Sequence, residues 1–397
     1  MEVEMDQNAA YAAFFHQSML AMMADLTDTV QAIPHVPPPD VREQAVHLLD
    51  LALQLDESWP AARDLLLELA PKMEQAGHRD DWLPFLIQGI NRSQRERDDL
   101  ITAELHIQVA LIYQLCSQLD LAYAHYSQAE VLFGINLDAQ NQARALNRMG
   151  YVALLQQQYE TAKNHINMAL KLLPTHAEEC AASYQVLGEL ALALAQWSAA
   201  EANFQKSLAI WVRYGDKRHI ARRLRDLGNT SFKQQDFHKS VSYFEQSITL
   251  FGEVDDLVQQ AIVRMNLGAV FLQTAKPTQA LTCFAQSEPM LRKAQDIWHL
   301  GILYHNQGIA HRQTQEWKLA EKSLRTSIMY RQQIGHKTQM VNSLLELGLL
   351  YIDRASWREA RETLESALFM LPEIVESHMR ENYRIKITSA IELLNHQ

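Results

Sequence analysis

Histidine and cysteine are the residue types best suited to metal binding or nucleophilic chemistry. The chain has 16 histidines and three cysteines. None falls in a catalytic or metal-binding motif, and Gly-rich phosphate loops, GxSxG, HExxH and EF-hand patterns are absent too. The nearest metal-ligand spacing is His176 with Glu179 and Cys180, which we interpret as solvated loop residues. Cys116 and Cys283 are expected to be buried thiols. The sequence therefore predicts no enzyme activity, no metal and no cofactor.

One segment gathers positive charge in a chain that is acidic overall. Residues 213–225 contain six Lys or Arg and one acid, whereas the whole chain has a formal net charge of −11. On a helix, Arg218, Arg222 and Arg225 share one face, and Arg223 does not. That face predicts binding of an acidic or phosphorylated peptide, or of a terminal carboxylate; the alternative is pairing with acids of a neighbouring repeat. The net charge argues against a nucleic-acid partner.

Cysteine usage and the N-terminus favour a cytoplasmic protein. Three cysteines without CxxC spacing favour a reducing compartment. The first residues are acidic where a secretory signal is basic, and every apolar run is far too short to span a bilayer. Neither secretion nor a membrane span is therefore predicted.

Glycine marks an internal repeat. Six of the 13 glycines recur at a nearly constant spacing, namely Gly150, Gly188, Gly228, Gly268, Gly308 and Gly348. Counted from this anchor as zero, position +9 is aromatic in five of the six repeats. Small, large and small residues follow at positions +12, +16 and +19, as in Ser240, Phe244 and Ser247. This regular order of sizes indicates helix packing.

The pattern predicts two antiparallel helices per repeat, in close contact where both carry small side chains. The first surrounds the glycine, and the second runs from about position +9 to about position +22. Punctuating residues fall where the second helix is expected to end: Gly134, Pro174, Gly215, Gly252, Gly335 and Pro372. Strand and hairpin signals are absent.

These repeats resemble the tetratricopeptide repeat, most clearly over residues 226–250 and 346–372. The 40-residue spacing is similar to the long-helix variant found in kinesin light chains and several bacterial regulators. Weaker repeats anchored on Ala110 and Ala70 extend the resemblance over residues 58–374. It implies an all-α fold, a right-handed superhelical solenoid of about eight helix-turn-helix repeats.

Flanking segments are expected to close the array. Residues 1–39 are expected to form an N-terminal helix and a Pro-rich tether, and residues 40–57 an unpaired capping helix that opens with a capping box of Asp40 and Glu43. Residues 375–397 are expected to form a C-terminal capping helix. The N-terminal helix covers the apolar edge of the first repeat or, alternatively, docks in the groove until a partner displaces it.

The resemblance also implies which positions of the first helices face a concave groove. Polar and basic residues occupy them: Arg144, Asn147, Arg148, Tyr151, Arg222, Arg225, Asn229, Lys233, Asn266, Gln273, His305, Asn306 and Gln313. Asparagine amides at such positions can donate to and accept from a peptide backbone. Arg225, Asn229 and Asn266 match positions of the carboxylate-clamp subclass, whereas Ile302 and Asn306 depart from its next Lys and Arg.

The sequence therefore predicts a non-enzymatic protein–protein interaction scaffold or adaptor that binds a partner peptide in the concave groove. The partner is expected to be another protein or peptide with an acidic or C-terminal carboxylate segment. The alternative is a peptide-sensing regulatory protein similar to the bacterial Rap receptors, which also join an N-terminal helical region to a tetratricopeptide array of similar length.

Overall fold

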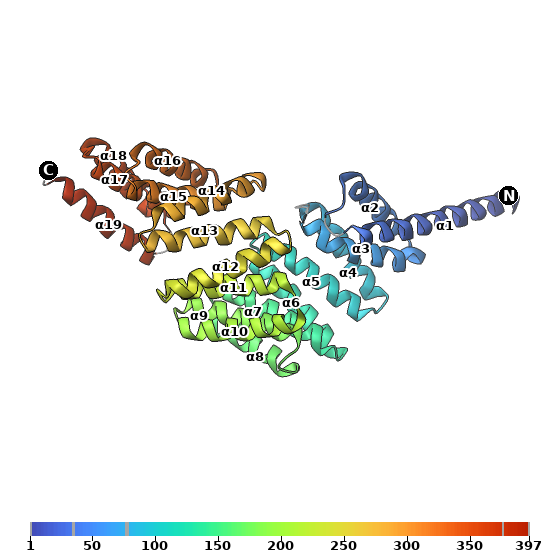
Figure 1. Cartoon of the computed structure of the whole chain (residues 1–397). Helices are drawn as coiled ribbons and strands as arrows, with labels where there is room; N and C mark the ends of the chain where they lie inside the picture. Colours follow the sequence, from blue (N-terminus) through green and yellow to red (C-terminus); the bar gives the residue numbers. More distant parts are fainter. Residues whose placement is uncertain (1, 34–35, 76–78, 375–376, 396–397) are drawn as a thin grey trace. The chain divides into compact units, whose positions relative to one another are not determined.

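The computed structural model describes residues 2–33, 36–75, 79–374 and 377–395, and all regular structure in these ranges is helical (Figure 1). The chain divides into two compact units, unit 1 (Met1–Leu190) and unit 2 (Ala191–Gln397). Within the described ranges, no helix is both long enough and apolar enough to cross a membrane.

Unit 1 contains the N-terminal helices and the first repeats. Its helices are α1 (Glu2–Ala32), α2 (Pro39–Ala52), a 3-10 turn (Asp56–Ser58), α3 (Trp59–Gln75), α4 (Arg79–Arg95), α5 (Asp99–Leu115), α6 (Leu119–Ile135), α7 (Ala139–Leu155), α8 (Tyr159–Leu172) and most of α9 (Glu178–Ala193).

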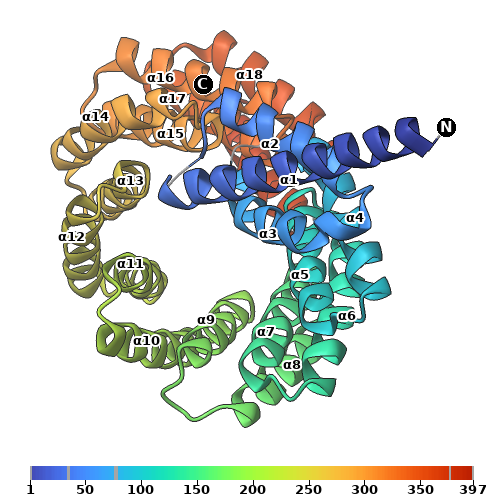
Figure 2. The ribbon, with the colours of Figure 1, turned by 90° about the vertical axis from the view of Figure 1, so that its right-hand side faces the viewer.

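Unit 2 contains the later repeats and the C-terminal helix. Its helices are α10 (Trp197–Tyr214), α11 (Lys217–Lys233), α12 (Phe237–Glu253), α13 (Leu257–Gln273), α14 (Pro277–Lys293), α15 (Ile297–Gln313), α16 (Trp317–Gln333), α17 (Lys337–Asp353), α18 (Trp357–Phe369), a 3-10 turn (Leu371–Glu373) and α19 (Ser377–Asn395). The first helices α11, α13, α15 and α17 contact one another in sequence order. Figure 2 shows α11 and α13 in one layer and α12 and α14 in the other.

The predicted helix pairs are present, and the fold is an all-α helical repeat solenoid. Eight pairs follow one another in the described chain, from α3–α4 to α17–α18. In the six glycine-anchored repeats, the second helix begins at the predicted position +9. It runs further than expected in α12, α14 and α16, which end at Glu253, Lys293 and Gln333, position +25 in each repeat.

Five of the six anchor glycines face the large residue found 16 positions later. A Cβ atom at Gly228 would lie 2.6 Å from the Phe244 ring, and one at Gly150 would lie 2.5 Å from Ile166 Cδ1. Such distances are far inside van der Waals contact, so the two helices pack this closely only around glycine. The same contact joins Gly268 to Phe284, Gly308 to Leu324 and Gly348 to Leu364.

The small serines of the pattern also form hydrogen bonds, which their size alone does not predict. Ser240 Oγ donates to the Gly228 carbonyl at 2.9 Å, and Ser247 Oγ donates to the Ala221 carbonyl at 2.7 Å. Both side chains are fully buried. Each serine therefore satisfies its own hydroxyl while it links the second helix to the first.

An aspartate at position −12 caps the first helix of most repeats. Asp216, Asp256 and Asp296 each accept a hydrogen bond from the backbone N–H three residues later. Asp98 and Asp138 do the same in unit 1. This series of capping aspartates stands in the sequence beside the glycines, although the caps were not predicted from it.

Most helices are followed by a residue with left-handed backbone conformation, which lies just after the end of the helix. These residues recur every 20 positions apart from the interval between Gln157 and Ala195, and only Gly215 and Gly335 among them are glycines. Gly134 and Gly252, expected to mark helix ends, lie one residue before the last residue of α6 and α12. The left-handed residues there are Leu137 and Asp255, with φ of 57° and 53°.

The N-terminal helices pack against the first repeat. Met19, Met23, Leu26 and Val30 of α1 are buried in one cluster with side chains of α2 and α3. Phe14 lies nearer the start of α1 and is 71% exposed. At the other end, α19 buries Tyr383, Ile387 and Leu394 against the final repeat. The division into segments at residues 39, 57 and 374 stays a prediction.

Three local predictions are wrong. The residue preceding α2 is Pro38, and no side chain caps this helix, so Asp40 and Glu43 form no capping box. The helix already includes Pro39, whose fixed φ suits a first helical turn. Cys116 is exposed because it follows the last residue of α5, whereas Cys283 is buried as expected. Glu179 and Cys180 are not loop residues, because both lie in α9. Cys180 is buried, with its Sγ 3.3 Å from the Pro174 carbonyl.

Candidate peptide-binding surface

Helix α11 carries the basic segment and begins at a well-defined turn. Gly215 adopts φ of 72°, and Asp216 then caps the helix by accepting from His219 N at 2.9 Å. The same carboxylate contacts His219 Nδ1 at 2.8 Å, and these bonds to His219 lower the pKa of Asp216 despite its partial burial. The start of α11 is therefore fixed, and with it the direction of the arginines that follow.

Arg218, Arg222 and Arg225, called the basic face below, are separated from Arg223 as helical spacing predicts. Arg223 points into the packed side of α11 and is 2% exposed. It forms an ion pair with Asp226 at 2.8 Å, and its guanidinium lies 6.0 Å from the centre of the Phe204 ring. Arg223 is thus a structural residue.

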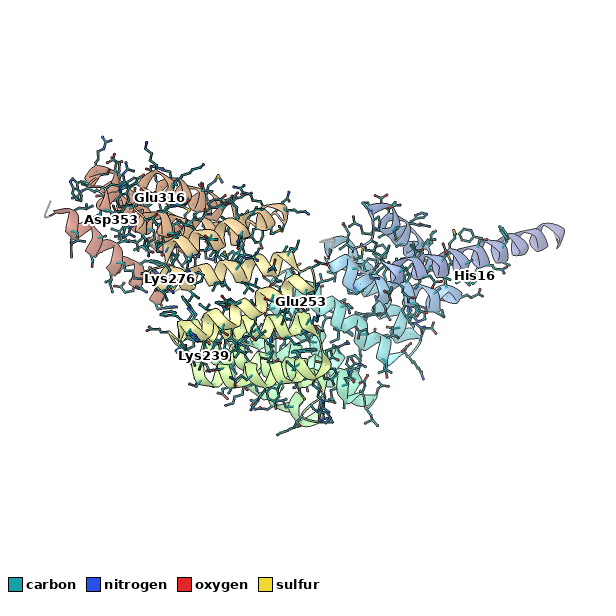
Figure 3. All side chains as sticks on the ribbon, viewed as in Figure 1. His16, Lys239, Glu253, Lys276, Glu316 and Asp353 are labelled. Atoms are coloured by element: carbon teal, nitrogen blue, oxygen red, sulfur yellow. The ribbon has the colours of Figure 1, made fainter. Side chains whose placement is uncertain are left out.

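Three members of the basic segment have partners within unit 2. Lys217 Nζ lies 2.9 Å from the carboxylate of Glu253, which Figure 3 labels at the end of α12. Arg218 Nη1 lies 3.7 Å from Asp256, and Arg225 donates to Gln259 Oε1 at 2.9 Å. These contacts hold α11 against α12 and α13.

Arg222 is the exception within the basic face. It is half-buried, and no described residue forms a hydrogen bond or an ion pair with it. The pKa of Arg222 is lowered mainly by burial and further by the neighbouring positive charge of Arg225. The negative charge of Asp256 opposes this lowering. Arg222 therefore carries a positive charge among like charges, and an incoming anion would relieve that repulsion.

Two predicted asparagines meet beside the basic face. Asn266 Nδ2 on α13 donates to Asn229 Oδ1 on α11 at 3.3 Å, and both side chains are half-buried. Because each amide retains further donors or acceptors, the pair can still engage a peptide backbone. Arg225, Asn229 and Asn266 thus lie on the adjacent helices α11 and α13, as the clamp-like spacing implies.

On the next first helix, α15, the predicted residues differ in their availability. His305 is held between Ser343 Oγ and Asn342 Nδ2, each 3.1 Å from one of its ring nitrogens. Burial lowers the pKa of His305 to about 4, so the ring is neutral near pH 7. Asn306 and Ile302 are half-buried. His305 therefore joins α15 to α17 rather than offering a free polar group.

In unit 1, two of the four predicted positions are occupied by internal contacts. Asn147 is 4% exposed; its Nδ2 donates to the Glu179 carbonyl at 3.0 Å, and its Oδ1 accepts from Ser183 Oγ at 2.7 Å. Arg144 forms an ion pair with Glu104. Tyr151 is half-buried, and Arg148 is exposed.

The remaining predicted positions in unit 2 lie near the ends of the first helices. Lys233, Gln273 and Gln313 are exposed there. They form no hydrogen bond with another described residue. They add exposed polar groups at the C-terminal ends of α11, α13 and α15.

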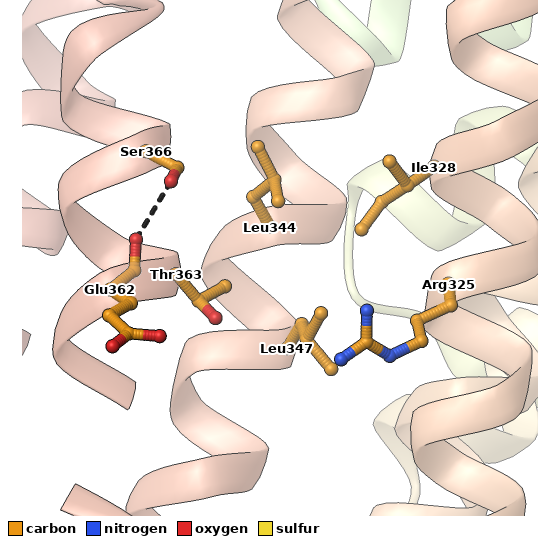
Figure 4. A pocket seen from close by; sticks show the side chains of 7 residues that line it. All are labelled: Arg325, Ile328, Leu344, Leu347, Glu362, Thr363 and Ser366. Carbon is orange, nitrogen blue, oxygen red and sulfur yellow. Dashed lines mark hydrogen bonds between the residues drawn. The ribbon is translucent and has the colours of Figure 1, made fainter. Parts of the chain in front are cut away.

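A shallow pocket lies elsewhere in unit 2, between α16, α17 and α18 (Figure 4). Ile328, Leu344 and Leu347 provide its apolar side chains, and Arg325 lies at one edge. Arg325 already donates to Glu321 Oε1 at 3.0 Å and to Tyr351 Oη at 2.8 Å. Its charge is therefore used within the fold.

The described side chains include no cluster of three or more His, Cys, Asp or Glu suited to a metal ion. His176 is exposed and Glu179 is half-buried, whereas Cys180 is turned into the protein. Burial raises the pKa of both the Cys180 and the Cys283 thiols, that of Cys283 to about 11. Both thiols therefore stay protonated near neutral pH.

Comparison with known structures supports the fold. Aspartyl phosphate phosphatase F from Bacillus subtilis is similar with a TM-score of 0.57 and 12% identity, over 86% of this chain and 97% of that one. A Rap protein in complex with competence and sporulation factor gives a TM-score of 0.51 and 12% identity, over 96% of this chain and 98% of the other. A signal-transduction ATPase with a tetratricopeptide repeat sensor from Pyrococcus horikoshii gives 0.57 and 12%, over 78% of this chain and 49% of that protein.

Sequence comparison identifies the repeat itself. No curated protein sequence matches the chain as a relative. A family model described as tetratricopeptide repeat matches residues 178–251 and 220–293, the segment that contains α9 to α14 and the basic face. Residues 178–293 are therefore tetratricopeptide repeats, and the 40-residue register of the sequence continues on both sides of this segment.

Proposed function

We propose that this protein is a non-enzymatic interaction scaffold or adaptor that binds a partner peptide on the surface formed by α11 and α13. The bound segment is acidic or ends in a free carboxylate. Arg222 supplies the central positive charge, and the amides of Asn229 and Asn266 engage the peptide backbone beside it.

The observation that carries this proposal is the state of Arg222. Its neighbours Arg218 and Arg225 both have partners within unit 2, whereas Arg222 has none among the described residues. Asp256 compensates the charge of Arg222 only in part, so the half-buried guanidinium can still accept an anion. A charge-assisted bond to a carboxylate would supply that neutralisation, and the planar guanidinium favours two parallel bonds.

Fluorescence anisotropy with labelled hexaglutamate tests the proposal. The purified full chain should bind hexaglutamate and should not bind hexaglutamine. Amidation of the peptide's C-terminus measures how much its terminal carboxylate contributes to the affinity. Replacing Arg222→Gln should weaken hexaglutamate binding about tenfold, because one charge-assisted hydrogen bond contributes about 1.5 kcal/mol.

Lys217→Gln is the matched control, because it removes the same charge from the same segment at a residue already paired with Glu253. It should change the affinity less than twofold. An equal loss of affinity in both variants would show that binding depends on the net charge of the segment rather than on Arg222. Failure of the unmodified protein to bind hexaglutamate would reject an acidic ligand.

A second candidate function is a peptide-sensing regulatory protein of the Rap type. It is supported by the match to a Rap protein bound to competence and sporulation factor, which spans 96% of this chain. A sensor changes conformation when its peptide binds, whereas a scaffold stays rigid. A high-affinity peptide is first selected from a random heptapeptide library, and small-angle scattering then compares the protein with and without it. A change in the radius of gyration favours the sensor, and an unchanged radius of gyration favours the scaffold.

A further inference from the structure

One repeat of unit 2 has an arginine where the other repeats have a buried apolar residue. Arg331 lies in the last turn of α16, at position +23 of its repeat, and is 1% exposed. The equivalent residues of five other repeats are aromatic or leucine and are at most 7% exposed: Phe133, Trp211, Phe251, Leu291 and Leu371. A core position therefore holds a charge in this repeat alone among those compared.

A second exception accompanies the first. At position −7, this repeat has Gly301, whereas its neighbours have Ala221, Ala261 and Val341. A Cβ atom at position 301 would lie 2.9 Å from Arg331 Nε and 3.1 Å from Cζ. The glycine thus makes room for the guanidinium group. Two linked departures from the repeat pattern indicate a constraint other than packing.

The surroundings of Arg331 leave its charge without a partner. Its Nε and Nη1 are buried, and neither forms a hydrogen bond with any described residue. The guanidinium carbon lies 5.5 Å from the centre of the Trp298 ring, a contact that compensates part of the charge. Burial lowers the pKa of Arg331 only to about 10, so the group remains charged near pH 7.

Polar groups close to Arg331 are engaged with one another. Ser327 Oγ donates to the Gly301 carbonyl at 2.8 Å, and it lies 3.0 Å from Ser343 Oγ. His305 lies near enough for the Arg331 charge to contribute to lowering its pKa, and it is held by Ser343 and Asn342. None of these groups carries the negative charge that a buried guanidinium requires.

We propose that Arg331 is the centre of a buried anion site that binds a halide-sized monovalent ion through Nε and Nη1. The ion must be small, because the side chain is almost fully enclosed and bordered by the α15 backbone at Gly301. Because Nε and Nη1 are both buried, the guanidinium must shift to admit it. A single charge matches the single positive charge of the Arg331 guanidinium. The site joins α15 and α16 and is independent of peptide binding at Arg222.

Thermal unfolding of the full chain tests the site. At equal ionic strength and pH 7, the melting temperature should be higher in sodium chloride or bromide than in sodium gluconate, whose anion is too large to enter. At ten times the dissociation constant the shift should be about 3 °C, because an ion that binds only the folded state stabilises it by mass action. Equal melting temperatures in chloride and gluconate would overturn the proposal.

The double variant Gly301→Ala with Arg331→Leu supplies the matched comparison. It recreates the Ala261 and Leu291 pair of the preceding repeat, so the position should pack as a normal core. The difference between chloride and gluconate should disappear in it. It should persist in Arg358→Leu, which removes an arginine whose side chain is 82% exposed. A difference retained by the double variant would place the ion elsewhere.

Crystals soaked in bromide provide a readout that does not depend on any variant. An anomalous peak should lie within hydrogen-bond distance of Arg331 Nε or Nη1. Bromide peaks confined to the surface would overturn the proposal, whatever the melting curves show.

Discussion

The two sides of α11 follow different rules. On the side that packs on α12, Gly228 contacts Phe244 and Ser240 bonds to the Gly228 carbonyl, and both contacts occur at positions of the 40-residue pattern. On the basic face, Arg222 has no equivalent in the neighbouring repeats, where Ile262 and Ile302 occupy the same position. The packing side is therefore common to the repeats, and the opposite side distinguishes one repeat from another.

This difference separates stability from recognition. Substitutions on the packing side should change the free energy of unfolding and leave the ligand alone, whereas substitutions on the basic face should do the reverse. The following predictions test that separation.

The largest effect is expected from Gly228→Leu. A leucine side chain cannot fit where even a Cβ atom would lie 2.6 Å from Phe244, so the free energy of unfolding should fall by about 3 kcal/mol. Chemical denaturation measures this change. Arg222→Leu introduces the same side chain on the other side of α11 and should alter stability by less than about 0.5 kcal/mol. Similar losses in the two variants would contradict the comparison.

A smaller effect is expected from Asp256→Ala, which acts on both properties. Loss of the cap on α13 should lower the free energy of unfolding by about 1 kcal/mol. The same change removes the carboxylate that lies 3.7 Å from Arg218 and opposes the lowering of the Arg222 pKa. Hexaglutamate should therefore bind more tightly, by anisotropy, although the protein is less stable. Asp296→Ala, which removes the equivalent cap of α15, should lower stability without changing the affinity.

A smaller loss of stability than that of Asp256→Ala is expected from Asn229→Ala combined with Asn266→Ala. Their mutual hydrogen bond of 3.3 Å is long and half-buried, so its loss should cost about 0.5 kcal/mol. Peptide affinity should fall severalfold in the same titration. Unchanged affinity in the double variant would move the binding surface away from α13.

The packing pattern was predictable because it repeats. Gly228, Phe244 and Ser247 could be assigned from spacing alone, since the same sizes recur at the same offsets in six repeats. The Asp256 cap belonged to the same kind of series and could have been found in the same way.

Side-chain partners on the variable surface were less predictable, because they depend on which residue the next repeat supplies. Asn147 is buried because Ser183 and Glu179 approach it, and His305 is occupied because Ser343 and Asn342 do. Helical spacing separated Arg223 from Arg222 correctly. It could not show that Arg218 and Arg225 find partners while Arg222 does not.

The left-handed turns have a consequence for protein engineering. Eleven of these positions hold residues other than glycine, among them Leu137, which is 90% exposed. An ordinary side chain in this conformation costs about 1 kcal/mol relative to glycine. Because the turns lie far apart along the chain, the gains from replacing them should add. Replacing these residues with glycine should therefore raise the melting temperature at positions away from Arg222. Such positions are expected when selection maintains stability only above a threshold.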